Sequence, residues 1–99
     1  MKRMTIERSN AFKRDYRREW RTHGRGLNDV LEDVIVMLLM DGSLPAKYKN
    51  HKLSGDWDGL WECHIKPNLL LVYDIVHQDG DNDLLWLVRL GSYAELLRL

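Results

Sequence analysis

The chain lacks most features of secreted, membrane-bound and disulfide-stabilised proteins. Its 99 residues include a single cysteine, Cys63, which cannot form an internal disulfide and fits a reducing compartment. The longest apolar run, Val34–Met40, is far too short to cross a bilayer. The amino-terminal residues contain no apolar stretch of the kind found in signal peptides. We therefore expect a cytoplasmic protein that does not enter a membrane.

Motifs for cofactors and metal ions are also missing. The sequence has no glycine-rich phosphate loop and no G-x-S-x-G motif, and its cysteine and histidines match no zinc spacing. In an extended segment, Cys63 and His64 point to opposite faces and cannot bind one ion together. We therefore predict neither a cofactor nor a metal site.

What is present indicates one globular domain over residues 1–99, with 44% hydrophobic and 30% charged residues. The net charge of zero is unevenly distributed. Residues 1–25 contain nine Lys/Arg and three Asp/Glu, a balance of +6, whereas residues 67–99 contain two and five, a balance of −3. The basic segment could contact phosphates or an acidic partner, but a solvated helix face explains it equally well.

The first half of the chain predicts a short strand and a helix. Thr5 and Ile6 give Met4–Glu7 the β-branched side chains that favour a strand. Ser9 is suited to cap a helix that ends near Gly24. The helix has one aromatic stripe with a spacing of four residues, formed by Phe12, Tyr16 and Trp20.

A second helix is predicted over Leu27–Met40. Asn28 is expected to cap its start and Gly42 to end it. Its apolar stripe is wide enough to indicate a helix that is buried on more than one side or covered by a partner. The short turn between the two helices makes them a helical hairpin.

The second half changes to a strand pattern. Short connections favour an antiparallel arrangement of three strands, followed by a short helix at Tyr93–Leu97 that Ser92 could cap. We therefore predict an α+β fold of order β-α-α-β-β-β, with the helical hairpin packed on an antiparallel sheet and a short C-terminal helix. The three strands are Leu60–Lys66, Leu69–Val76 and Leu84–Leu90.

The strand Leu60–Lys66 carries the candidate chemistry. Alternation places Trp61, Cys63 and Ile65 toward the core and Glu62, His64 and Lys66 on the accessible face. If Pro67 and Asn68 form a two-residue hairpin loop, His64 lies opposite Leu71 and Glu62 opposite Tyr73.

His51 precedes a loop, 54–59, that could fold it back toward His64. Two histidines can serve as base and acid when a ribose 2′-hydroxyl attacks the adjacent phosphate, although a structural or solvated histidine is the more common case. Arg89 is a candidate to hold that phosphate, or else a salt-bridge partner of Asp74 or Glu95. Tyr93 could donate or accept a proton.

A set of motifs in this half resembles the YafQ branch of the RelE/ParE toxin superfamily. A histidine before x-Leu-x-Gly-x-Trp is followed by His-x-x-Pro, a tyrosine-containing strand and a closing Arg-x-Gly-Ser. The helical hairpin also matches in order and length. The motifs occupy residues 51–57, 62–67, 70–73, 89–92 and 94–97.

The resemblance implies a RelE-like fold and a ribosome-dependent endoribonuclease, an mRNA interferase, that cleaves mRNA without a metal ion. It also implies a cognate antitoxin, expected to be of the ribbon-helix-helix type, through which the complex would bind operator DNA. His51 and His64 match the two family histidines, and Arg89 matches the arginine before the final turn. With Tyr93 these form the predicted catalytic set. We assign RNA binding to Lys52, Lys66 and Asn68.

Two positions depart from the family pattern. Asn68 stands where the family has an aspartate, and Tyr93 stands where it has a C-terminal histidine. A tyrosine can act as a base at neutral pH only in a cationic neighbourhood. The alternative prediction is therefore a non-catalytic module, either ParE-like or restricted to binding an antitoxin.

Overall fold

The computed structural model describes residues 3–78, 80 and 82–97. A five-stranded sheet of order β1-β5-β4-β3-β2 forms its centre. The predicted α+β class is confirmed. The elements are β1 (Arg3–Arg8), α1 (Asn10–His23), α2 (Gly26–Asp41), the 3-10 turn η1 (Ala46–Tyr48), β2 (His51–Lys52), the 3-10 turn η2 (Gly55–Trp57), β3 (Trp61–Lys66), β4 (Leu69–His77), β5 (Asn82–Gly91) and α3 (Tyr93–Leu97).

The sheet is mixed. Strands β3, β4 and β5 pair antiparallel, as predicted, and the short strand β2 adds to β3 antiparallel, but β1 pairs with β5 in parallel. The prediction of a wholly antiparallel sheet is therefore wrong for β1. A parallel pair needs a long crossover, and the two helices and the strands that follow them supply one. The sequence pattern of Met4–Glu7 predicts a strand but cannot identify its partner.

The helices confirm most of the predicted ends. Ser9 caps α1 by accepting the Phe12 N–H at 2.9 Å, and Gly42 ends α2 in a left-handed conformation with φ 66°. The prediction that Asn28 caps α2 is wrong. The helix begins two residues earlier, at Gly26, and the Asn28 side chain accepts a hydrogen bond from the Tyr16 hydroxyl instead.

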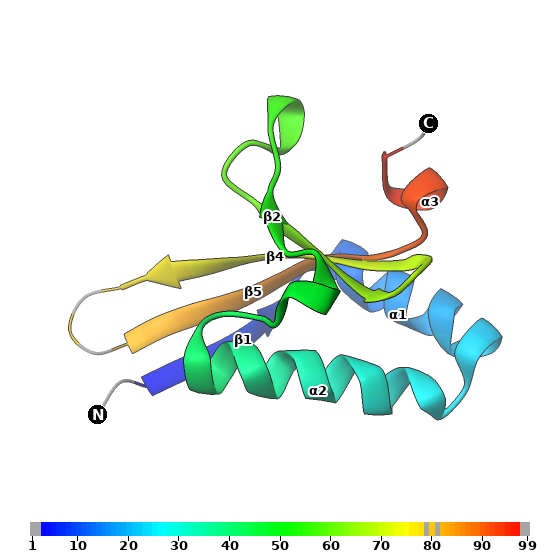
Figure 1. Cartoon of the computed structure of the whole chain (residues 1–99), viewed down its shortest axis with the longest axis horizontal. Coiled ribbons are helices and arrows are strands. Elements are labelled where there is room, and N and C mark those ends of the chain that lie inside the picture. The colour runs from blue at the N-terminus through cyan, green and yellow to red at the C-terminus, as the bar shows by residue number, and fades with distance from the viewer. Residues whose placement is uncertain (1–2, 79, 81, 98–99) are drawn as a thin grey trace.

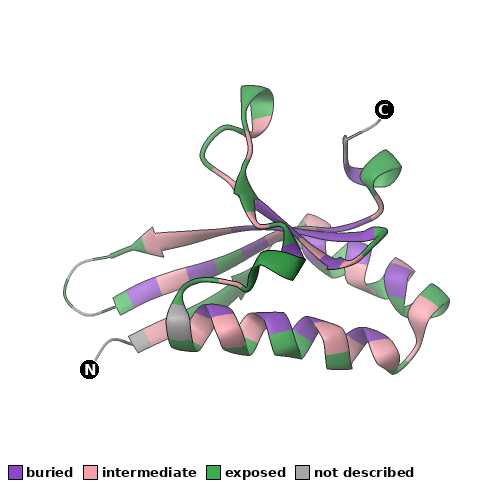
Figure 2. Cartoon of the chain, viewed as in Figure 1, coloured by how far each residue is buried: buried purple, intermediate pink, exposed green. Residues whose placement is uncertain are grey.

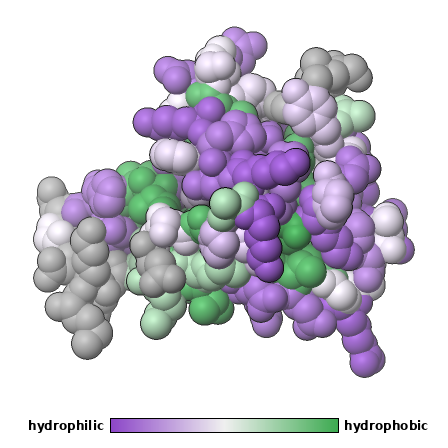
Figure 3. All heavy atoms as spheres, in the orientation of Figure 1, coloured by the Kyte–Doolittle hydropathy of each residue, from purple (hydrophilic) through white to green (hydrophobic). Residues whose placement is uncertain are grey.

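The main core lies between the helices and one face of the sheet. The buried residues of α2 recur on one side of the helix, as Figure 2 shows, and they are Leu27, Leu31, Val34 and Leu38. The opposite side of α2 is not buried, since Val36 is 54% and Met40 79% exposed. Hydrophobic side chains accordingly gather low in the view of Figure 3, over α2, whereas hydrophilic ones cover the middle of that face. Of the two alternatives for this wide stripe, burial on more than one side is wrong, and cover by a partner stays a prediction.

A second, smaller core lies on the other face of the sheet. Figure 1 shows α2 along one side of the sheet, while β2 with its following loop and α3 rise on the other side. Apolar side chains hold these parts to the strands, namely Leu70, Val72 and Leu96 with Leu53, Trp57, Leu60 and Val88. This face positions the candidate site. Within the residues described, none of the helices has the length and apolarity needed to cross a membrane.

An irregularity in β3 changes the predicted register. His64 pairs with Leu70 and Glu62 with Val72, one residue from the predicted partners. The two-residue turn at Pro67-Asn68 is present, because Lys66 pairs with Leu69 on its other side. One extra residue therefore lies in β3 between His64 and Lys66, which is a β-bulge.

Candidate active site

Glu62 lies between the two histidines. The pairing of β2 with β3 places His51 opposite Glu62, and His64 follows two residues later on the same face. Glu62 Oε1 lies 3.4 Å from His51 Nε2 and 3.9 Å from His64 Nε2. The two imidazole centroids are 6.4 Å apart. The structure thus brings together the two histidines that the sequence predicts, with a carboxylate between them.

The Glu62 carboxyl group is almost fully buried. Its side chain is 2% exposed, and Oε2 has no hydrogen-bond partner in the described part of the chain. A buried carboxylate oxygen without a hydrogen-bond partner is costly, so Oε2 indicates a functional site more than a stabilising one. His64 is half-buried and His51 exposed, which leaves both rings accessible from outside.

The backbone before β2 orients His51. His51 Nδ1 lies 2.8 Å from the Lys49 carbonyl oxygen, and since a carbonyl only accepts, Nδ1 is the nitrogen that carries the proton. The other nitrogen, Nε2, therefore faces Glu62. Lys49 has φ 49°, the only non-glycine residue with positive φ among those described. Such a conformation costs roughly 1–2 kcal/mol and is often found at functional sites.

The cluster can exchange protons with a substrate. Each imidazole has a nitrogen that can take a proton from one group and return it to another. Glu62 can stabilise the imidazolium that forms, because its Oε1 lies within ion-pair distance of both rings when they are protonated. The arrangement therefore supplies a base, an acid and a stabilising carboxylate for a general acid–base reaction.

Arg89 lies in the same row of paired strand residues as Glu62, but its side chain is held by Asp15 of α1. It pairs with Val72, which pairs with Glu62, so two strand spacings, about 10 Å, separate Arg89 from Glu62 along the row. Its Nε and Nη2 donate to the two carboxylate oxygens of Asp15 at 2.7 and 3.2 Å. The prediction that Arg89 forms a salt bridge with Asp74 or Glu95 is therefore wrong.

Asp15 is the buried centre of this ion pair. Besides Arg89, it accepts hydrogen bonds from Arg18 Nη1 at 3.0 Å and from the Leu90 N–H at 3.0 Å. Burial alone would raise the pKa of Asp15. The hydrogen bonds from Arg89 and Leu90 and the charges of Arg89 and Arg18 outweigh burial and hold that pKa below its usual value.

Arg18 joins α1, β5 and α3. Its Nη2 donates to the Leu90 carbonyl at 2.8 Å, and its Nε lies 2.8 Å from Glu95 Oε2. A Cβ at Gly91 would lie 2.5 Å from Arg18 Nη2, so a larger residue there would displace the guanidinium group. Hydrogen bonds from Ser92 and the charge of Arg18 lower the pKa of Glu95 despite its partial burial. As predicted, Ser92 caps α3, by accepting the Glu95 N–H at 3.2 Å.

Tyr93 and Asn68 lie near the ends of the strands that carry the cluster. Tyr93 is exposed and begins α3, two residues after Gly91, which shares a row with Leu70 and His64. Asn68 is exposed in the turn between β3 and β4. Both lie just beyond the strand ends that are nearest to His64, and in the described structure no hydrogen bond or ring contact joins either residue to a histidine.

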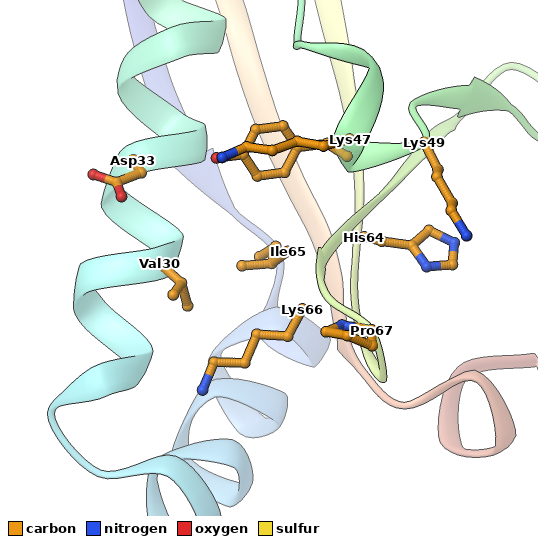
Figure 4. Close-up of a pocket in the computed structure, with 9 residues that line it drawn as sticks. Val30, Asp33, Lys47, Lys49, His64, Ile65, Lys66 and Pro67 are labelled. Atoms are coloured by element: carbon orange, nitrogen blue, oxygen red, sulfur yellow. The ribbon is translucent and has the colours of Figure 1, made fainter.

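Two lysines assigned to RNA binding lie apart from the cluster. Lys52 pairs with Trp61 and places Nζ 5.7 Å from the centroid of its ring. Lys66 was predicted on the face of His64, but the bulge turns it to the other face, where Nζ lies 3.5 Å from His23 Nδ1. Figure 4 shows this divergence: Lys66 extends toward the helices, and His64 points away from them.

Cys63 takes no part in the cluster. It is fully buried in the main core, and burial raises its pKa to about 12, with a smaller contribution from the charge of Glu62. Over residues 3–78, 80 and 82–97, no three His, Cys, Asp or Glu side chains form a group that could hold a metal ion.

The family described as "Bacterial toxin of type II toxin-antitoxin system, YafQ" matches residues 4–98. The chain belongs to this family. The predicted resemblance is thereby confirmed. A similar curated protein is the mRNA interferase toxin YafQ of Escherichia coli strain K12, which is 29% identical over 92% of each chain.

Solved structures of similar toxins have the same fold. The E. coli DinJ-YafQ toxin-antitoxin complex contains a chain that is 30% identical, with a TM-score of 0.76 and coverage of 97% of this chain and 98% of that one. A metal-bound toxin from Helicobacter pylori is 38% identical, with a TM-score of 0.76 and coverage of 93% and 97%.

Sequence reasoning missed two carboxylates that organise the site. Glu62 shares the accessible face with His64 in the alternation pattern, so its proximity to His64 could have been found. Its contact with His51 depends on the pairing of the two-residue strand β2. Asp15 carries no such signal, since its partner Arg89 lies 74 positions away.

Proposed function

We propose that the chain is a ribosome-dependent endoribonuclease that cleaves mRNA by metal-independent acid–base catalysis. The observation that carries the proposal is the placement of the buried Glu62 carboxylate between the Nε2 atoms of His51 and His64. The curated relative from E. coli is named an mRNA interferase toxin, which supports RNA as the substrate. Dependence on the ribosome is proposed from the family resemblance.

In the proposed reaction, one imidazole takes the proton of a ribose 2′-hydroxyl, and the 2′-oxygen attacks the adjacent phosphorus. A 2′-O–P bond forms and the P–O5′ bond breaks, and an acid gives the departing 5′-oxygen its proton. His51 and His64 are the candidates for base and acid, and Glu62 stabilises whichever ring is protonated. The products are a 2′,3′-cyclic phosphate and a 5′-hydroxyl.

Arg89 and Tyr93 complete the proposed catalytic set. Arg89 would stabilise the charge on the phosphorane, with Asp15 fixing the plane of its guanidinium and two of its nitrogens. Tyr93 replaces the family histidine, and its exposure leaves the hydroxyl accessible to a substrate. Asn68 can contact RNA from the β3–β4 turn through its amide.

We also propose an antitoxin as the partner that holds the toxin inactive in the cytoplasm. The solved complex of the E. coli relative with DinJ supports an antitoxin partner. We propose a ribbon-helix-helix antitoxin that carries the complex to operator DNA.

The chemistry of the cleavage products tests the enzymatic proposal. Wild-type protein with programmed ribosomes is expected to give 5′-hydroxyl and 2′,3′-cyclic phosphate ends, and His51→Ala and His64→Ala are expected to give none. An mRNA with a 2′-deoxy sugar at the cleaved position should be resistant, because the nucleophile is missing. Products with 5′-phosphates would contradict the mechanism. Translation arrest without cleavage would favour the non-catalytic binding module, which the Asn68 and Tyr93 departures support.

A further inference from the structure

A second basic surface adjoins the histidine cluster on the helix side of β3. A pocket of about 460 Å³ lies between α2, η1 and the end of β3. Its lining includes three lysines, Lys47, Lys49 and Lys66, together with His64 and Asp33. Figure 4 shows Val30 and Asp33 on α2, Lys47 and Lys49 at η1, and His64, Ile65 and Lys66 on β3.

The lysines of this pocket carry uncompensated charge. Three ammonium groups face one lining carboxylate, that of the exposed Asp33. Within the described part of the chain, none of these lysines has a carboxylate oxygen within 4.0 Å. Lys47 Nζ lies 5.1 Å from the Tyr48 ring centroid, and Lys66 Nζ lies 3.5 Å from His23 Nδ1, which carries no negative charge. A pocket with this balance of charge favours an anion.

The pocket is continuous with the cluster. His64 belongs to both, since it lines the pocket and faces Glu62 Oε1. Lys49 also connects them, because it lines the pocket while its carbonyl oxygen accepts a hydrogen bond from His51 Nδ1. The bulge in β3 is what directs Lys66 into the pocket instead of onto the face of His64.

We infer that Lys47 and Lys66 bind a phosphate of the RNA strand that flanks the phosphate cleaved at His51 and His64. Lys49 contacts the RNA strand between the flanking phosphate and the cleaved phosphate. A volume of about 460 Å³ is within the range of pockets that hold a small-molecule-sized group, such as one nucleotide. The inference rests on the proposed function for the identity of the ligand as RNA.

Salt-dependent binding tests this inference without any cleavage. The probe is a short, fluorescent single-stranded RNA with 2′-O-methyl sugars throughout, which cannot undergo attack by a 2′-hydroxyl. For wild type and for Lys47→Gln/Lys66→Gln, fluorescence anisotropy gives the slope of log affinity against log salt concentration. Each single-strand phosphate that the protein neutralises contributes about 0.7 to that slope, so loss of the one phosphate held by Lys47 and Lys66 should reduce it by about 0.7.

A charge-matched control removes two exposed cations from α1, in Lys13→Gln/Arg21→Gln. We expect it to reduce the slope by less than half as much. Equal slopes for the pocket variant and wild type, equal losses in the two double variants, or no binding by wild type would overturn the inference. So would a poly-glutamate peptide that binds as tightly as the RNA and loses affinity in the pocket variant, because the pocket would then be a site for acidic peptides. Because this RNA cannot be cleaved, failure of the proposed nuclease activity alone would leave the result unaffected.

Discussion

The ion pair between Asp15 and Arg89 gives the most quantitative prediction for stability. Asp15→Asn keeps the size of the side chain and one acceptor oxygen but removes the negative charge. The carboxylate accepts four hydrogen bonds, from Arg89 Nε and Nη2, Arg18 Nη1 and the Leu90 N–H. In the variant, an amide N–H₂ group would face at least one of these donors.

The magnitude follows from the burial of the partners. Removing one partner of a fully buried ion pair costs about 3–5 kcal/mol. The Arg89 and Arg18 side chains are 26% and 38% exposed, so water can solvate part of the charge that remains. We therefore expect Asp15→Asn to lower the free energy of unfolding by about 2 kcal/mol. With a urea m-value of about 1–3 kcal/mol/M, the unfolding midpoint should fall by about 1 M.

The pH dependence of the unfolding free energy provides a second, independent test of the role of Asp15. The pKa of Asp15 is lowered in the folded state, so its contribution to stability is fully present above the unfolded-state pKa, about 3.9. That contribution disappears as the pH falls through the lower, folded-state pKa. The difference between wild type and Asp15→Asn should therefore be constant near neutral pH and shrink below about pH 4.

Urea unfolding followed by circular dichroism measures both quantities. Asp33→Asn is the control, because it makes the same chemical change at an exposed carboxylate of α2 and should alter stability by less than about 0.5 kcal/mol. Equal midpoints for wild type and Asp15→Asn at neutral pH would refute the reasoning. A difference that stays constant into the acid range would refute the pKa argument.

Three further predictions concern Glu62, Cys63 and Lys49. Glu62→Leu should abolish RNA cleavage yet raise the free energy of unfolding by about 1 kcal/mol, because the buried Oε2 has no described partner. A cleavage assay and thermal unfolding measure the two effects, and a variant less stable than wild type would contradict this account. Cys63 should react with a thiol reagent at pH 8 only after unfolding in urea, since it is buried and its pKa is raised to about 12, whereas rapid stoichiometric labelling of the native protein would show the site to be open. Lys49→Gly should be more stable than Lys49→Ala by about 0.5–1 kcal/mol, because only glycine adopts a positive φ without strain, and equal stabilities would place this strain elsewhere.

Local patterns in the sequence predicted much of the fold. The helix positions, the Ser9 cap, the glycine at the end of α2 and the three long strands follow from periodicity and turn chemistry over short distances. The parallel pairing of β1 with β5 could not be predicted in this way, since it joins segments at opposite ends of the chain.

The candidate site shows the same division between local and distant effects. Alternation in β3 placed His64 and Glu62 on one face, and a short loop was expected to bring His51 near them. The β-bulge after His64 depends on how β3 pairs with β4, and the local residue pattern does not predict it. It explains why the prediction for Lys66 was wrong and why Lys66 joins Lys47 and Lys49 in the second basic surface.

Mapping mRNA 5′ ends in cells after induction of the toxin tests the central claim most directly. The cells would express wild type or the double variant His64→Ala/Tyr93→Phe, with circular dichroism of the purified proteins showing that the variant is folded. The acid–base cluster predicts new 5′-hydroxyl ends within translated messages for wild type, and neither new ends nor growth arrest for the variant. Growth arrest by wild type without new 5′ ends, or full toxicity of the double variant, would contradict it.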